Sequence, residues 1–234
     1  GFFFLEGFDY GTGILLPVIG KTDVERRQMI NALGPIWDGN EVWMITAGGA
    51  LFASFPHVYA TLFSGFYMAL FLMLAVLIMR GVAFEFRSKS ANRTWRKVFD
   101  YCIFIGSIVP ALLWGVTVGN LIQGTPIDET MTYVGTFWDL LSPYTVLCGV
   151  AFVLVFTYHG GLFTSIKTAG PISERARAAS LVTGVPTAIG VIALIIASYV
   201  YTDLYSSILA TIFCALAVVC FLISWAAART RNTK

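Results

Sequence analysis

The sequence is short of charge. Of its 234 residues, 12% are charged, which is about half the share of an average soluble domain, whereas 57% are hydrophobic. The mean hydropathy is correspondingly high, at +0.78. This composition excludes an ordinary soluble globular domain and indicates a membrane protein.

The chain also lacks the cysteine patterns of metal sites and haem attachment sites. Its four cysteines show no CxxC or CxxCH spacing, so they do not predict a zinc site, a covalently attached haem or a disulfide framework. All four fall within apolar runs, at Cys102, Cys148, Cys214 and Cys220. We interpret them as packing residues.

Histidine is equally scarce, with only His57 and His159 present. They fall at the outer and inner ends of different apolar runs, so they cannot ligate one haem together. No Met or Cys is placed to supply a second axial ligand to either of them. We therefore predict that this chain ligates no haem and no other metal.

Long apolar runs occupy most of the chain and predict seven transmembrane helices. Each run is about 20 residues or longer, which is the length that a helix needs to cross roughly 30 Å of hydrocarbon. The runs do not alternate as the strands of a membrane barrel would. The fold class is therefore an all-α polytopic membrane protein. The predicted spans are Gly1–Gly20, Ile36–Phe55, Val58–Phe86, Val98–Ile122, Leu140–Phe163, Ala178–Tyr201 and Leu204–Ala228.

Basic residues fall on one side of this map. All 15 Lys and Arg lie near the connections after spans one, three and five or in the C-terminal tail, and the connections on the other side contain none. The positive-inside rule then places residue 1 outside and Lys234 in the cytoplasm. Since topology explains the basic clusters, no nucleic-acid partner is needed.

Span one carries two carboxyls in the stretch LEGFDYGTG. At 100° per residue Glu6, Asp9 and Gly13 share one face of the helix, while Gly7 and Gly11 share another, on which a second backbone can approach closely. Ionisable groups at membrane depth are costly and mark functional sites by default. The two carboxyls are interpreted either as a proton relay or as structural partners of polar groups on neighbouring helices.

Span two begins in the stretch GPIWDGNEVW. Asp38 followed three residues later by Glu41 matches a capping box, in which Asp38 is the N-cap of the helix. The alternative is that Asp38, flanked by Trp37 and Trp43, takes protons from the cytoplasm. The two roles are compatible. Farther along, Arg80 and Arg87 near the inner end of span three are attributed to snorkelling and local pairing.

Several stretches of residues 1–90 form a distinctive series, which reads LEGFDYGTGILLP, ERRQMINALGPIW, WDGNEVWMITAGGALFASFP and YATLFSGFYMALFLMLAVLIMRGVAFEFRSK. A looser series follows in FIGSIVPALLWGVTVGNLIQG and in YHGGLF and KTAGPISERARAAS. In these stretches, which cover most of the chain, the protein resembles subunit II of the cytochrome bd-type quinol oxidases.

The resemblance implies a subunit of a terminal oxidase in the bacterial cytoplasmic membrane. A partner, subunit I, would ligate two b-type haems and one d-type haem, oxidise quinol and reduce dioxygen to water with protons from the cytoplasm. This chain would ligate none of the haems, support the assembly and provide a proton or dioxygen path. Membrane lipid would surround the complex. Whether a small single-helix third subunit is present stays an open question.

Carried over by motif, Asp38 of the WDG stretch marks the mouth of a proton path. Glu6 and Asp9 are secondary candidates for that path, and Trp43 is a candidate for its lining. No catalytic residue and no metal ligand is assigned to the chain.

The family plan is two four-helix bundles plus one helix, nine in all. The seven spans fit this plan if the start of the first helix and the last two helices are absent. Residues 1–20 then form the apparently truncated first transmembrane helix, residues 21–163 hold the first four-helix bundle (helices 2–5), and residues 164–234 start the second bundle (helices 6–7).

Two other functions are compatible with the residues. A secondary transporter could bind a substrate and a coupling proton at its buried carboxyls, although the inverted repeats and broken helices of such folds have no clear counterpart here. A purely structural subunit would use the same carboxyls only for capping and packing. Co-isolation with a haem-bearing chain would favour the oxidase, whereas a haem-free, substrate-binding monomer would favour the transporter.

Overall fold

The computed structural model describes residues 1–230, which form nine α-helices and three short 3-10 helices. Among these residues there is no strand, only a single bridge between Ile127 and Tyr133 in a loop. The α-helices are α1 (Phe2–Ile19), α2 (Asp23–Leu33), α3 (Trp37–Ser54), α4 (Pro56–Gly65), α5 (Tyr67–Phe86), α6 (Arg93–Gln123), α7 (Pro143–Lys167), α8 (Pro171–Tyr201) and α9 (Ile208–Thr230). The 3-10 helices are η1 (Arg87–Lys89), η2 (Phe137–Leu140) and η3 (Leu204–Ser206).

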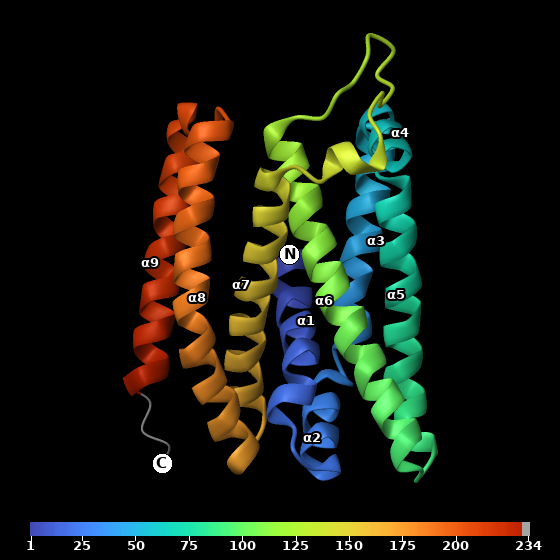
Figure 1. The fold of residues 1–234 in the computed structure, drawn as a ribbon, viewed down its shortest axis with the longest axis vertical. Coiled ribbons are helices and arrows are strands. Elements are labelled where there is room, and N and C mark those ends of the chain that lie inside the picture. Colours follow the sequence, from blue (N-terminus) through green and yellow to red (C-terminus); the bar gives the residue numbers. More distant parts are fainter. Residues whose placement is uncertain (231–234) are drawn as a thin grey trace.

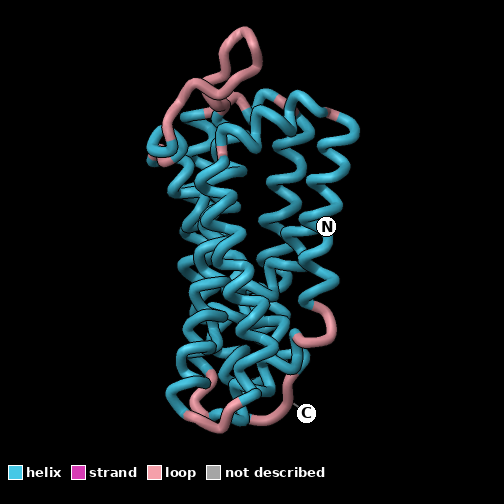
Figure 2. The backbone as a smooth tube through the Cα atoms, turned by 90° about the vertical axis from the view of Figure 1, so that its right-hand side faces the viewer, coloured by secondary structure: helices cyan, strands magenta, loops and turns pink. Residues whose placement is uncertain are grey.

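The long helices run along the long axis of the molecule, and the loops gather at its two ends (Figures 1 and 2). The short helix α2 and the connections α5–α6 and α7–α8 lie at one end, which we call the basic end (Figure 1). The helix α4 and the loop of residues 124–142 lie at the opposite end (Figure 1). The predicted cytoplasmic placement of Arg231 and Lys234 concerns residues outside the described part of the chain.

Six helices of the described chain are long and apolar enough to cross a membrane, and the prediction of seven spans is not confirmed. Predicted span two is present as α3, but its first two turns carry Asp38, Asn40 and Glu41, which lower its hydropathy below that of a spanning helix. Predicted span three is two helices rather than one. Its first part is α4, which begins at Pro56 and is separated from α5 by the non-helical backbone of Phe66.

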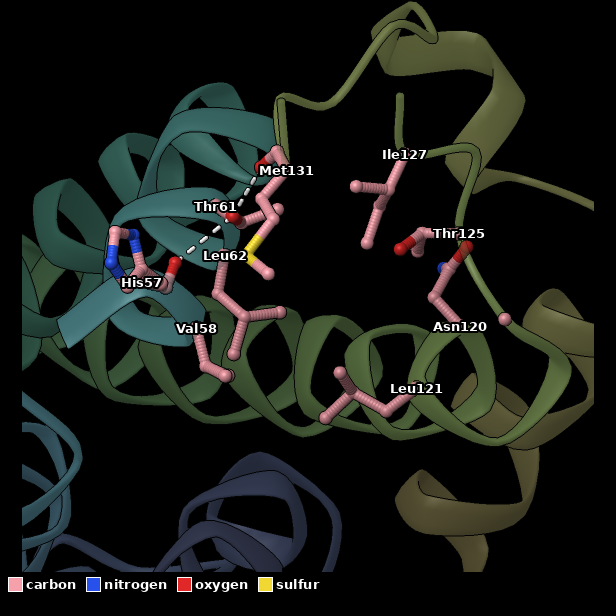
Figure 3. Close-up of a pocket in the computed structure, with 10 residues that line it drawn as sticks. His57, Val58, Thr61, Leu62, Asn120, Leu121, Thr125, Ile127 and Met131 are labelled. Carbon is pink, nitrogen blue, oxygen red and sulfur yellow. Dashed lines mark hydrogen bonds between the residues drawn. The ribbon is translucent and has the colours of Figure 1, made fainter. Parts of the chain in front are cut away.

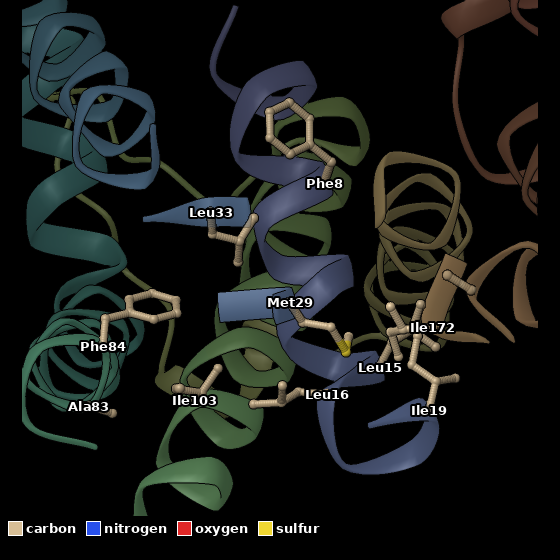
Figure 4. Packing of buried hydrophobic residues seen from close by; sticks show 11 residues of the cluster. Phe8, Leu15, Leu16, Ile19, Met29, Leu33, Ala83, Phe84, Ile103 and Ile172 are labelled. Atoms are coloured by element: carbon tan, nitrogen blue, oxygen red, sulfur yellow. The ribbon is translucent and has the colours of Figure 1, made fainter. Parts of the chain in front are cut away.

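Helix α1 lies at the centre of the packing. Its residues from Glu6 to Leu16 are all buried, and it contacts α3, α6, α7 and α8. Leu15 and Leu16 of α1 meet Met29 of α2 and Ile103 of α6 in one apolar cluster, which Figure 4 shows. A helix with this many neighbours presents its polar residues to other helices rather than to lipid or water.

Glycines bring α1 and α7 into direct backbone contact. A Cβ placed on Gly11 would overlap the carbonyl oxygen of Phe156, and one placed on Gly160 would overlap the backbone of Gly11. A Cβ on Gly7 would lie 2.8 Å from the ring of Phe156. The prediction that the Gly7 and Gly11 face admits another backbone is therefore confirmed.

Ion pairs hold α2 against the ends of α5 and α6. Asp100 of α6 accepts hydrogen bonds from Arg26 Nη1 at 2.7 Å and from Arg87 Nε at 2.5 Å. Asp23 of α2 accepts from Arg87 at 3.0 Å and from Arg96 at 2.7 Å. We call these five residues the basic-end network. It combines two carboxylates with three guanidinium groups.

Glu25 ties the start of α2 to α8. Its carboxylate accepts from the backbone N–H of Thr22 in a capping box and from the guanidinium of Arg175. The backbone hydrogen bond from Thr22 and then the bond from Arg175 lower the pKa of Glu25 from 4.5 to about 2. Glu25 therefore stays ionised at physiological pH.

Candidate functional site

Three helices bring five polar side chains together inside the molecule. Glu6 and Asp9 come from one face of α1, Asn40 and Glu41 from the beginning of α3, and Arg80 from the last third of α5. We call them the Arg80 cluster. The sequence analysis selected both α1 carboxyls and Glu41, but it did not place them beside one another.

Arg80 connects the carboxyls of two helices through one nitrogen atom. Its Nη1 donates to Glu6 Oε1 at 2.6 Å and to Glu41 Oε1 at 2.6 Å. Asn40 Nδ2 donates to Asp9 Oδ2 at 2.7 Å. The predicted structural role of Glu6 and Asp9, as partners of Asn and Arg groups on neighbouring helices, is present in these contacts.

The cluster is deeply buried on its α1 and α5 side. Glu6, Asp9 and Arg80 have 0% exposure, whereas the Glu41 side chain is 21% exposed. The guanidinium of Arg80 lies over the rings of Tyr10 and Phe84, with 4.9 Å and 5.1 Å to the ring centroids. The attribution of Arg80 to snorkelling is therefore wrong, because its head group points into the protein.

Many polar atoms around the cluster have no protein partner. The second carboxyl oxygens of Glu6 and Asp9 accept from no N–H group, and the two carboxyls lie within hydrogen-bond reach of each other, so they can share a proton. Two of the three guanidinium nitrogens of Arg80 have no protein partner. Buried polar groups in folded proteins are normally paired with protein atoms or with ordered water. The unpaired side-chain atoms here are Glu6 Oε2, Asp9 Oδ1, Tyr10 Oη, Arg80 Nε, Arg80 Nη2 and Trp114 Nε1.

The charges of the cluster do not balance. Three carboxyls face a single guanidinium, so full ionisation would leave two uncompensated negative charges in apolar surroundings. An uncompensated buried ion costs several kcal/mol. Such a cluster gains or loses a proton more readily than a neutral ion pair does, which is the property that a proton path requires.

The capping role predicted for Asp38 and Glu41 is wrong. Helix α3 begins at Trp37, its N-cap is Ile36, and no side chain caps it. Asp38 lies in the first turn, where the positive end of the helix dipole stabilises its negative charge. Glu41 turns inward and bonds Arg80. Within residues 1–230 the exposed carboxylate of Asp38 has no hydrogen-bond partner.

Trp43 stands apart from the Arg80 cluster. It is 48% exposed, and it lies beside the N-terminus of α1, where a Cβ on Gly1 would be 3.2 Å from its ring. The structure thus brings together Glu6, Asp9 and Glu41 of the predicted site residues. It leaves Asp38 and Trp43 on the outer surface of α3.

A model of the family described as cytochrome bd terminal oxidase subunit II matches residues 1–234, the whole chain. The chain belongs to this family. The subunit II chain is 48% identical over 191 residues to "Cytochrome bd-I ubiquinol oxidase subunit 2" of Escherichia coli strain K12, a match that covers 80% of this chain and 50% of the relative.

Two further relatives show the same pattern. "Probable cytochrome oxidase subunit 2" of Haemophilus influenzae is 49% identical over 193 residues, which cover 81% of the subunit II chain and 51% of the relative. "Cytochrome bd ubiquinol oxidase subunit 2" of Bacillus subtilis is 45% identical over 177 residues, which cover 76% of this chain and 52% of the relative. The chain thus spans about half the length of the curated relatives that it matches.

The two histidines of this chain lie too far apart to ligate one haem together. His57 lies in the first turn of α4, at the end of the molecule opposite the basic end (Figure 1). His159 lies 16 residues into α7, about 24 Å along that helix from the same end. Its ring packs against Phe4 and Phe8, at 5.4 Å and 5.5 Å between centroids.

No group of three or more His, Cys, Asp or Glu side chains in the described chain could hold a metal ion. A cavity of about 480 Å³ does open between α4, α6 and the loop of residues 124–142. Figure 3 shows the ring of His57 turned away from it, while Leu62, Leu121 and Ile127 face its interior. The cavity is mostly apolar and offers no set of metal ligands.

Sequence reasoning missed the central residue of the site. Arg80 is the one charged residue in the run of α5 from Tyr67 to Phe84, and an isolated arginine in such a run was the available signal. It was placed at the end of its span, where long basic side chains reach the interface. Asn40 was missed because an amide near a helix start has many ordinary roles.

Proposed function

We propose that this chain acts as part of the haem-free second subunit of a cytochrome bd-type quinol:dioxygen oxidoreductase. The observation that carries the proposal is its 48% identity, over 80% of its residues, to a protein named as a bd-I ubiquinol oxidase subunit. The partner is a subunit I that holds two haem b groups and one haem d. When bound there, the haems supply electron transfer from quinol to dioxygen.

The contribution of this chain is a route for protons. Asp38 collects protons at the exposed start of α3, Trp43 lines the outer surface of that helix, and Glu6 and Asp9 lie farther inside. The charge imbalance and the unpaired polar atoms of the Arg80 cluster support this role. A dioxygen path has no comparable support among the described contacts and stays a prediction.

The basic end faces the bacterial cytoplasm in this proposal, and the loop of residues 124–142 faces outward. The asymmetry of Lys and Arg supports this orientation. Membrane lipid covers the outward apolar faces, of which α9 is the most exposed. The small single-helix third subunit stays a prediction.

The test is an Asp38→Asn variant in the assembled oxidase, measured in inverted membrane vesicles. Quinol oxidation and the alkalinisation of the outer medium are expected to slow together by about 10²-fold, the usual cost of losing a proton-transfer group. The matched control is Glu174→Gln, which alters an exposed carboxyl on α8. Proton uptake from the vesicle interior would overturn the orientation.

A purely structural subunit is the second candidate, because Glu6 and Glu41 both form ion pairs with Arg80. Unchanged turnover and proton uptake in Asp38→Asn would favour it. The transporter alternative has no support from the comparisons, since each of the relatives is named as an oxidase subunit.

A further inference from the structure

We infer that Glu41 is the residue that passes protons between the exposed Asp38 and the buried pair Glu6 and Asp9. The inference rests on the proposed proton route and adds to it the one carboxyl that joins the surface to the interior. Sequence patterns gave Glu41 only a capping role, which the structure excludes.

The register of α3 places Glu41 next to the surface carboxyl. Asp38 and Glu41 are three residues apart, so their side chains leave neighbouring positions on one face, about 5–6 Å apart at Cβ. Within this chain Asp38 is exposed and Glu41 is 21% exposed, so neither carboxyl is closed off by the other helices. Among the carboxyls of the cluster, Glu41 alone is partly exposed, since Glu6 and Asp9 have 0% exposure.

Arg80 joins Glu41 to the interior. One nitrogen atom, Nη1, donates at 2.6 Å to an oxygen of Glu41 and at 2.6 Å to an oxygen of Glu6. Glu41 and Glu6 thus share one donor nitrogen, and a water molecule that bridges two such carboxyls is nearly as favourable as a direct hydrogen bond. The free Glu6 Oε2 and Asp9 Oδ1, with the unpaired Arg80 nitrogens, provide partners for such water.

The transfer balances without any further reactant. An O–H bond of water breaks as an O–H bond forms on Asp38, and the hydroxide that remains makes the medium alkaline. The O–H bond of Asp38 then breaks as an O–H bond forms on Glu41, and Asp38 returns to the carboxylate. The same exchange moves the proton from Glu41 through bridging water to Glu6 or Asp9. Arg80 keeps its charge throughout and stabilises whichever carboxyl is ionised.

The charged and titratable groups that face Glu41 are known from each packed helix. Helix α1 contributes Glu6, Asp9 and Tyr10, helix α3 contributes Asp38, and helix α5 contributes Arg80. Helix α6 has no charged residue after Asp100, and at Gly106 it packs against the Cβ of Arg80. The difference between the pH profiles of a Glu41 variant and of the wild type therefore reports on this set of groups.

The decisive variant is Glu41→Gln in the complete oxidase complex. Glutamine keeps the size of the side chain and an oxygen that accepts from Arg80, but it cannot carry a proton. We expect turnover and proton uptake to fall by about 10²-fold while the haem spectrum stays unchanged. The matched control is Glu85→Gln, an exposed position near the end of α5 that should leave turnover as it was.

The outcomes separate this inference from the proposed function. Slow turnover in the Asp38→Asn variant, together with normal turnover in the Glu41→Gln variant, would overturn the role of Glu41 and leave the proton route in place. Normal turnover in both variants would overturn both. If Glu41→Gln fails to assemble, Glu41→Asp decides, because it retains a titratable group. A shifted pH profile of turnover in Glu41→Asp supports the inference, and an unshifted profile overturns it.

Discussion

The chain contains two networks of arginine and carboxyl groups, and they are built differently. In the basic-end network two carboxylates meet three guanidinium groups, and both carboxylates accept from two arginines. In the Arg80 cluster one guanidinium meets three carboxyls, and most of its neighbours keep an unpaired polar atom. Nearly all polar atoms of the first network have hydrogen-bond partners, whereas several of the second network have none.

The difference indicates different uses for the same residue types. A satisfied network has one favourable arrangement and stabilises the helix ends that it connects. A network with excess carboxyls and free polar atoms changes its protonation and hydration at low cost. The basic-end network is therefore interpreted as structural, and the Arg80 cluster as the part that works in turnover. Two substitutions test this contrast, and a third tests the separate ion pair of Glu25 with Arg175.

Arg80→Gln is expected to have the largest effect. Removal of the cation of the cluster leaves the buried Glu6 and Asp9 and the partly exposed Glu41 without compensation, and a broken buried pair costs about 3–5 kcal/mol. The oxidase should assemble poorly, and what assembles should unfold at a lower temperature. Thermal unfolding of the purified complex and the yield of bound haem measure this.

The control is Arg93→Gln, an exposed arginine at the start of α6. The double variant Arg80→Gln with Glu6→Gln sharpens the result, because it removes one of the uncompensated carboxyls and should recover part of the lost stability. If the Arg80→Gln variant unfolds at the wild-type temperature, the carboxyls of the cluster are neutral in the absence of Arg80.

Asp100→Asn is expected to have an intermediate effect of a different kind. It weakens the bonds to Arg26 and to the buried Arg87, at a cost of about 2 kcal/mol in the free energy of unfolding. Turnover per assembled complex and its pH profile should stay as in the wild type. A shifted pH profile would contradict the division between the two networks.

Glu25→Gln is expected to have the smallest effect, visible only in acid. Because the folded state lowers the pKa of Glu25 from 4.5 to about 2, the ionised carboxylate stabilises the fold above pH 4.5. This stabilisation is lost as the pH falls from 4.5 toward 2. The unfolding temperature of the variant should therefore decline less steeply over that range, with Glu174→Gln as the control. Equal slopes would show that Glu25 is not coupled to folding.

The sequence predicted the class of the fold and part of the site. Apolar run length was sufficient to find the spanning helices, and the spacing of Gly7 and Gly11 predicted the close crossing with α7. The pattern of hydropathy could not show that residues 56–86 break at Phe66, because α4 and α5 are equally free of charge up to Arg80. Run length also predicted a span at α3, whose polar first two turns hold its mean hydropathy below that of the six spanning helices.

The arrangement of the Arg80 cluster could not be derived from local patterns. Glu6 and Arg80 are 74 residues apart in the chain, and Glu41 and Arg80 are 39 apart. Helical periodicity places residues on a face of one helix, but it does not say which helix that face meets. The capping prediction failed for the same reason, since the ion pair with Arg80 competes with a local role for Glu41.

The crossing of α1 and α7 at Gly11 and Gly160 has a consequence for motion. Where two backbones touch, no side chain is present that could switch rotamer and let the helices slide. The contact opposes sliding of α1 along α7, and α1 carries Glu6 and Asp9 within about one and a half turns of Gly11.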